Sequence, residues 1–194
     1  MTSNTLRLFI AIELDPSVRE AIGIIQDHLR KSGADVKWVK PDDIHLTLKF
    51  LGDTPTDIVD KIANAMQESV QSVKKFLIEI TGLGAFPKIS SPRIIWVGIE
   101  NGRKEVKQIA ASLEEKLETL GIKKEEREFS AHITVGRTRS PQNIFALSKI
   151  LKEFKSTAPI TQEVSHITLI KSTLTAQGPV YEVLRRADFG NSRA

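Results

Sequence analysis

The sequence predicts an α+β protein made of two related lobes, each an antiparallel sheet with helices, around a cleft. Three observations support this class: strand-like and helix-like segments alternate along the 194 residues, their order recurs after about 86 residues, and the strands have one polar face. Strands of buried parallel sheets are nearly continuous apolar runs, whereas a polar face is typical of antiparallel sheets that are open on one side. The open faces of two such sheets would line the cleft.

The first half of the chain is predicted to hold three strands and two helices. A strand over 7–12 precedes Asp15-Pro16, a helix cap with proline at the first helical position, and the helix ends at Gly33. The remaining elements are a strand over 44–50, a helix that Thr54-Pro55 opens, a strand over 76–80 and a turn region over 82–87.

The second half repeats this order. Its elements are a strand over 93–98, a helix from about 103 to Gly121, a strand over 132–135, a helix that Ser140-Pro141 opens and a strand over 164–170. Corresponding landmarks lie 86 or 87 residues apart, which predicts a duplicated unit, at about 6–81 and 92–170, within a single bilobal domain covering 1–194. A turn at 177–179 leads into a last strand over 180–184, and we expect the polar tail, 190–194, to be frayed.

Composition narrows the function classes. The residues are 40% apolar and 27% charged, as in ordinary globular proteins, and the net charge of +4 favours an anionic partner. Cysteine is absent, which excludes disulfides, thiolate zinc sites and cysteine nucleophiles. No stretch has the length of a membrane span, and residues 1–4 do not resemble a signal peptide. We therefore expect a cytoplasmic protein without membrane contact.

Threonine follows three of the four histidines at a distance of two residues, at His45, His132 and His166. Successive side chains of a strand point to opposite faces, so each motif places an imidazole and a hydroxyl side by side. Only 14 of the 194 residues are threonine, so chance rarely produces this pattern. The pattern indicates a functional site, with a pair of surface histidines as the alternative.

The repeat selects two of the three motifs. His45 and His132 are 87 residues apart and correspond to each other, whereas the position that corresponds to His166 is Glu79. We therefore expect His45 and His132 on opposite walls of the cleft, and His166 on a polar strand face without a catalytic role. His28 lies on a polar helix face and is expected to be solvated.

Two histidines with Thr47 and Thr134 are sufficient to open a cyclic phosphodiester without a metal ion. One group must accept a proton from water while another protonates the leaving oxygen, and histidine, with a pKa near 6.5, can do either. The hydroxyls can donate to phosphoryl oxygens. These residues do not reveal which histidine is the acid, and we expect neither a metal nor a cofactor.

Arg137 is the candidate cation for the phosphate, because it lies just past Gly136, where the strand can bend, and its planar fork suits phosphate oxygens. Lys49 continues the face of His45 and Thr47, so it either adds positive potential or is simply solvated. The aromatic rings of Trp38 and Phe50 can stack on a base. Their apolar neighbours favour core packing instead, most of all for Phe50.

These motifs resemble the two-histidine (2H) phosphoesterases, in particular the bacterial and archaeal RNA 2′,3′-cyclic phosphodiesterases, also called 2′-5′ RNA ligases. The resemblance runs from about residue 6 to 189, and the segments that carry it are HLTLKFLG at 45–52, HITVGR at 132–137, GAFP at 84–87 with Pro92-Arg93, and GPVY at 178–181.

The resemblance implies a bilobal fold with pseudo-two-fold symmetry. It also implies hydrolysis of a terminal RNA 2′,3′-cyclic phosphate to a 2′-phosphomonoester, with 2′-5′ ligation as a side or reverse activity. His45 would protonate the leaving 3′ oxygen, His132 would activate water, and Thr47, Thr134 and Arg137 would bind the phosphate. The expected partner is an RNA with a cyclic phosphate end, such as a tRNA fragment, and the expected working species is a monomer.

Two alternatives stay open at this point. The same catalytic groups would act on a small cyclic nucleotide, because they do not depend on what carries the phosphate. A mildly basic cleft would also suit an RNA-binding module without catalysis, in which neither His45 nor His132 matters for function.

Overall fold

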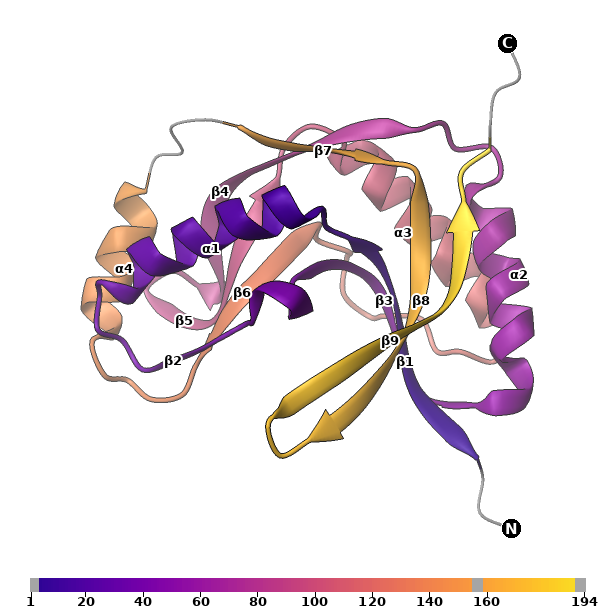
Figure 1. The fold of residues 1–194 in the computed structure, drawn as a ribbon, viewed down its shortest axis with the longest axis horizontal. Helices are drawn as coiled ribbons and strands as arrows, with labels where there is room; N and C mark the ends of the chain where they lie inside the picture. The colour runs from indigo at the N-terminus through magenta and orange to yellow at the C-terminus, as the bar shows by residue number, and fades with distance from the viewer. Residues whose placement is uncertain (1–3, 155–158, 191–194) are drawn as a thin grey trace.

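The structure, a computed structural model, describes residues 4–154 and 159–190, which form two antiparallel sheets and four α-helices (Figure 1). The expected α+β class is confirmed. No helix in these two ranges is long and apolar enough to cross a membrane.

Sheet A has four strands and contains both ends of the described chain. Its strand order is β3 (His45–Pro55), β1 (Thr5–Glu13), β8 (His166–Thr175) and β9 (Gly178–Asp188). β1 pairs with β8 only as far as Lys171, so the remainder of the β8–β9 hairpin leaves the sheet as a two-stranded ribbon, which Figure 1 shows in yellow.

Sheet B has five strands, all paired antiparallel. Its order is β2 (Val36–Trp38), β6 (His132–Thr138), β5 (Ser91–Ile99), β4 (Phe76–Lys88) and β7 (Ile160–Val164). Both sheets therefore combine strands from the two halves of the sequence.

The helices on each sheet also come from both halves of the sequence. α2 (Val59–Val70) and α3 (Arg103–Glu118) pack together over sheet A, although the strand before α3, β5, belongs to sheet B. α1 (Pro16–Arg30) and α4 (Ile144–Glu153) pack over sheet B, although the strand before α1, β1, belongs to sheet A. The lobes are thus not the sequence repeats, since each lobe takes elements from both halves.

Apolar stripes on the helices explain this packing. α1 buries Val18, Ile22, Ile25 and Leu29, and α3 buries Val106, Ile109, Leu113 and Leu117, at the three- and four-residue spacing of an amphipathic helix. These side chains join the inner faces of both sheets in one buried cluster, which leaves the opposite face of each sheet for other use.

Several expected boundaries are wrong, and the short strand β2 was not predicted. The strand predicted over 164–170 is two strands, β7 and β8, which Ser165 separates and which belong to different sheets. Residues 82–87 lie within β4, with a bulge near Gly82, and the turn comes later, between Lys88 and Ser91. β3 continues to Pro55, and the short 3₁₀ helices η1 (Pro41–Asp43) and η2 (Thr56–Ile58) were not predicted. Residues 191–194 of the predicted tail lie outside the described residues.

Candidate active site

The two His-x-Thr strands share an irregularity directly after the threonine. Opposite β1, Thr47 pairs with Ala11 and Lys49 with Ile10, so Leu48 is an extra residue in β3. Opposite β5, Thr134 pairs with Trp96 and Gly136 with Ile95, so Val135 is the extra residue in β6. Both are β-bulges, which re-aim the side chains that follow them.

The bulge decides which side chains join the open face. Before it, His45 and Thr47 alternate with buried Leu46, and His132 and Thr134 alternate with buried Ile133. The extra residue and the one after it are both buried in each strand. The next residue returns to the open face, and it is Phe50 on β3 and Arg137 on β6.

A cleft of about 500 Å³ lies between the open faces of the two sheets. His45, Thr47 and Tyr181 of sheet A line it together with Thr134 and Arg137 of sheet B. His132 is not part of this lining. It lies two residues from Thr134 on the same face of β6, and its ring is partly exposed. The structure thus brings four of the five predicted site residues to the cleft and places His132 on the same strand face at its border.

Each histidine ring is oriented by the carbonyl two residues before it. Nδ1 of His45 lies 2.8 Å from the oxygen of Asp43, and Nδ1 of His132 lies 2.7 Å from the oxygen of Ser130. A carbonyl only accepts, so Nδ1 carries the hydrogen in both rings. This tautomer leaves Nε2 of each ring as the atom that exchanges a proton with a ligand.

Aromatic rings hold each imidazole from the side. His45 lies 4.7 Å from the ring of Phe9 and 5.4 Å, edge to face, from Tyr181. His132 lies 5.0 Å, edge to face, from Phe86, with Trp96 at 6.3 Å. The sequence offered only a weak signal for these supports, namely the alternation of Phe9 with buried neighbours and the segments GAFP and GPVY, to which no role was assigned.

Burial lowers the pKa of both histidines below 6.5 in the unliganded protein. The hydrogen bonds to Asp43 and Ser130 oppose this shift, and the nearby cations, Arg19 for His45 and Arg137 for His132, add to it. Both rings are therefore mostly neutral near pH 7, and a bound phosphate anion would favour the protonated form of a neighbouring ring.

Tyr181 is a site residue that the sequence did not single out. Burial raises the pKa of its hydroxyl, Asp43 adds to that rise, and Arg137 and Arg7 oppose it. The phenol therefore lies within electrostatic reach of arginines from both sheets, and it stays protonated as a hydrogen-bond donor.

The expectation for Lys49 is wrong. The bulge turns its side chain to the buried face, where it is only 2% exposed and Nζ lies 2.8 Å from both the Glu114 carboxylate and the carbonyl of Lys123. Lys49 thus connects the strand of His45 to α3 rather than adding potential to the cleft.

The preference for core packing at Phe50 is wrong for the same reason, since Phe50 is 60% exposed and lines the cleft. Trp38 lines the cleft too, but it is partly buried, with Cζ of Arg30 5.2 Å from the centre of its ring and Gly136 packed against the ring. It forms a fixed wall.

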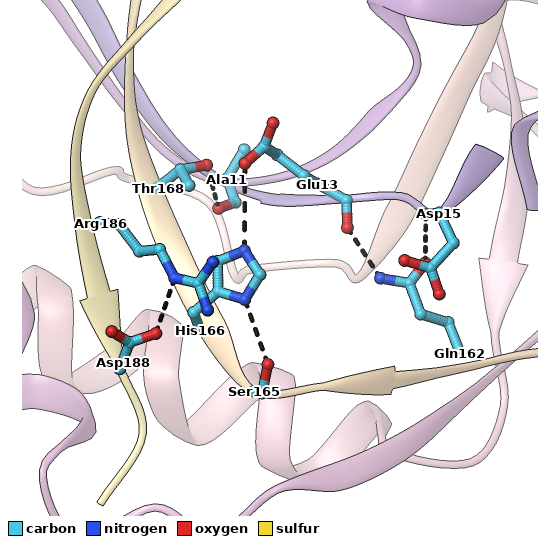
Figure 2. Close-up of polar contacts among 9 residues, drawn as sticks. All are labelled: Ala11, Glu13, Asp15, Gln162, Ser165, His166, Thr168, Arg186 and Asp188. Carbon is cyan, nitrogen blue, oxygen red and sulfur yellow. Dashed lines mark hydrogen bonds and ion pairs between the residues drawn. The ribbon is translucent and has the colours of Figure 1, made fainter.

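Figure 2 shows the surroundings of His166. Its Nδ1 lies 3.2 Å from Ser165 Oγ, its Nε2 lies 4.0 Å from Glu13, and Arg186 and Asp188 are beside it. Thr168, unlike Thr47, is buried and donates to the carbonyl of Ala11. This third motif does not line the cleft. His28 is exposed, as expected.

A group of three or more histidines, cysteines and carboxylates that could hold a metal ion does not occur within 4–154 and 159–190. The groups that line the cleft are the imidazole of His45, the hydroxyls of Thr47 and Thr134 and the guanidinium of Arg137, and the second oriented imidazole, His132, lies on the same face of β6 as Thr134. Two sheets that face each other and each contribute a His-x-Thr strand define the class of two-histidine phosphoesterases.

Sequence comparison agrees with this class. The profile of the 2′-5′ RNA ligase superfamily matches residues 15–175, and the chain belongs to that family. An RNA 2′,3′-cyclic phosphodiesterase of Archaeoglobus fulgidus is 36% identical over 183 residues, 93% of this chain and 98% of the relative. One of Methanocaldococcus jannaschii is 35% identical over 180 residues, 93% and 99% of the two chains. The resemblance drawn from the motifs is confirmed.

Solved structures share the fold. The TT0787 protein of Thermus thermophilus superposes with a TM-score of 0.78 at 26% identity, covering 96% of this chain and 100% of the other. LigT of E. coli, solved in complex with 3′-AMP, superposes with a TM-score of 0.75 at 24% identity, covering 96% and 99%.

Proposed function

We propose that the protein hydrolyses a 2′,3′-cyclic phosphate at the end of an RNA to a 2′-phosphomonoester, with His45 and His132 as acid and base. The observation that carries the proposal is that two His-x-Thr strands, one from each sheet, each present an imidazole whose Nδ1 is held by a backbone carbonyl. The relatives that match over most of their length are named RNA 2′,3′-cyclic phosphodiesterases, which supports this substrate.

Proton transfer follows from the tautomers. Nε2 of His132 takes a proton from water, the water oxygen bonds to phosphorus, and the bond from phosphorus to O3′ breaks. Nε2 of His45, protonated beforehand, gives its proton to O3′. Burial lowers the pKa of both rings and favours their neutral forms, as the base requires. The anionic phosphate favours the charged form of the ring beside the leaving oxygen, and the family resemblance assigns that role of acid to His45.

Phosphate binding falls to three side chains. The hydroxyls of Thr47 and Thr134 donate to the non-bridging oxygens from opposite walls, and Arg137 adds a charged fork. Donors from fixed strands need no rearrangement while negative charge builds up on those oxygens, which is the main source of stabilisation in such reactions. The same groups would serve 2′-5′ ligation, in which a ribose hydroxyl replaces water.

The test is the product of a defined oligonucleotide that ends in a 2′,3′-cyclic phosphate. We expect a 2′-phosphate end, formed at full rate in EDTA. A 3′-phosphate product would reverse the roles of the histidines, and the absence of turnover by a protein that binds the oligonucleotide would leave a binding module instead. Much higher kcat/KM on a free cyclic nucleotide would indicate a small-molecule enzyme.

We further propose that the natural substrate is an RNA fragment such as a cleaved tRNA, processed by a monomer in the cytoplasm. Sequencing of RNA ends that accumulate without the protein, together with its solution mass and location, tests this.

A further inference from the structure

Charge in the cleft is unbalanced. Its lining has four cations, Arg7, Lys37, Lys40 and Arg137, but a single carboxylate, Asp43. None of the four cations forms an ion pair within the described part of the chain, whereas cations such as Lys107, Lys171 and Arg185 do, on the outer surface.

The excess of positive charge is greatest at Lys37 and Arg137. They are directly opposite each other in the antiparallel pair of β2 and β6, and both side chains line the cleft. Like charges in directly opposite positions of a sheet are destabilising. Neither residue forms an ion pair within the described residues, so the positive charge of the pair favours a bound anion between the two side chains.

One cyclic phosphate does not account for all four cations. It carries a single negative charge, and under the proposed function Arg137 and the two threonines already bind it. Lys37, Lys40 and Arg7 are left over; Arg7 lies opposite Asp53 in the pair of β1 and β3, and Lys40 lies near Asp43, so Lys37 is the least compensated of the three. The same cleft also exposes apolar surface, at Phe50 and at Leu174 of the β8–β9 ribbon, which is 68% exposed. Surplus cations beside exposed apolar surface suit single-stranded nucleic acid.

We propose that Lys37, assisted by Lys40 and Arg7, binds the phosphodiester that joins the terminal nucleotide to the preceding one, so that the protein recognises two nucleotides of a single-stranded RNA end. This inference rests on the proposed function and adds a second phosphate subsite to it. The subsite selects RNA ends over free cyclic nucleotides, because only the former have this phosphodiester.

Three substrates isolate the subsite: a free 2′,3′-cyclic nucleotide, a dinucleotide with the same cyclic end, and that dinucleotide with a neutral methylphosphonate linkage. We expect the wild-type kcat/KM to be about tenfold higher on the charged dinucleotide than on the neutral one. This advantage should shrink as the salt concentration rises. The logarithm of the ratio of the two kcat/KM values should fall against the logarithm of the salt concentration with a slope of about −0.7 for each phosphate contact on a single strand.

Lys37→Met and Lys37→Met/Lys40→Met should remove most of this advantage, and they should change turnover of the neutral dinucleotide far less. Lys61→Met/Lys104→Met removes the same charge from exposed positions on α2 and α3 and serves as the control. Equal losses on all three substrates would mean that the lysines act on the cyclic phosphate or on the net charge, and would overturn the proposal, as would no loss on any.

A stability measurement separates binding from a structural role. Because Lys37 faces Arg137 without a carboxylate, Lys37→Met should leave the unfolding temperature of the unliganded protein unchanged or raise it. A lower unfolding temperature would mean that Lys37 supports the fold, and the loss on the dinucleotide would then be no sign of a subsite. A wild-type protein inactive on every cyclic end would instead refute the proposed function.

Discussion

Phe50 occupies on β3 the position that Arg137 occupies on β6. Each lies three residues beyond the threonine of its motif, after a bulge whose extra residue is Leu48 or Val135, and each returns to the cleft. The two halves of the site are therefore alike in backbone and different in chemistry, with an aromatic ring on one wall and a guanidinium on the other.

Replacement of His45 or His132 should nearly abolish hydrolysis. His45→Ala and His132→Ala should each lower kcat by about 10²- to 10⁴-fold, because each removes one proton transfer, while RNA binding largely survives. His166→Ala is the matched control and should change kcat less than about threefold, since the His166 ring lies beside Ser165 and Glu13 and the threonine of its motif, Thr168, is buried. Loss of activity only in the His166 variant would contradict the assignment.

The pH profile should be bell-shaped and centred below pH 6.5. Activity requires neutral His132, so it falls as the pH drops below the lowered pKa of that ring; it requires charged His45, so it falls as the pH rises through the lowered pKa of His45. Arg19 lowers the pKa of His45, so Arg19→Gln should move only the alkaline limb of kcat/KM, to higher pH.

Lys31→Gln, an exposed change just beyond the same helix, is the control for this shift. Movement of the acidic limb in the Arg19 variant would mean that the assignment of the two limbs is reversed.

The pair of Lys49, which is buried, and Glu114, which is partly exposed, should contribute to stability only while both partners are present. Lys49→Ala leaves the carboxylate without its partner and should lower the free energy of unfolding by about 1–3 kcal/mol, whereas Lys49→Met/Glu114→Leu should restore most of it. Urea unfolding measures both.

The exposed pair of Lys107 and Glu128 has the same 2.8 Å separation. Lys107→Ala should leave unfolding nearly unchanged, because solvent screens that pair. Equal effects at the two sites would show that burial is not what makes Lys49 important.

Gly84 should resist substitution because of the ring beside His132. An added Cβ would lie 2.1 Å from Cζ2 of Trp96, so Gly84→Ala must displace that ring, at a cost of about 1–3 kcal/mol in stability and with reduced kcat. Gly23→Ala, within α1 and with open space around it, should be neutral or stabilising. Thermal unfolding and kcat of both variants check this, and a fully active, stable Gly84→Ala would show that the tryptophan position is unimportant.

The local sequence pattern was enough to predict the helices. It also predicted that His45, Thr47, His132 and Thr134 lie on open strand faces, because strand alternation holds up to the threonine. It failed at Lys49 and Phe50, because a bulge adds a residue that no local sequence signal marks. Arg137 was found because Gly136 suggested a bend.

Strand pairing and contacts between residues far apart in the sequence could not be predicted from the local sequence pattern. The division of 160–175 between two sheets depends on Ser165, a single residue in an apolar run, and on which strands lie alongside it. Phe9 and Tyr181 meet at His45 from positions 172 residues apart. Only the folded chain shows such neighbours.

Each sheet combines strands from both halves of the sequence, and this affects how the chain folds during its synthesis. Sheet A needs β1 and β3 from the beginning of the chain and β8 and β9 from its end, so β1 waits on the ribosome, with one edge unpaired, until the last strands emerge. Pairing across so many residues is slow, and open strand edges invite association with other chains. The growing chain is therefore most vulnerable to aggregation just before β8 and β9 emerge, when α1 to α4 have already been made and sheet A still lacks two of its four strands.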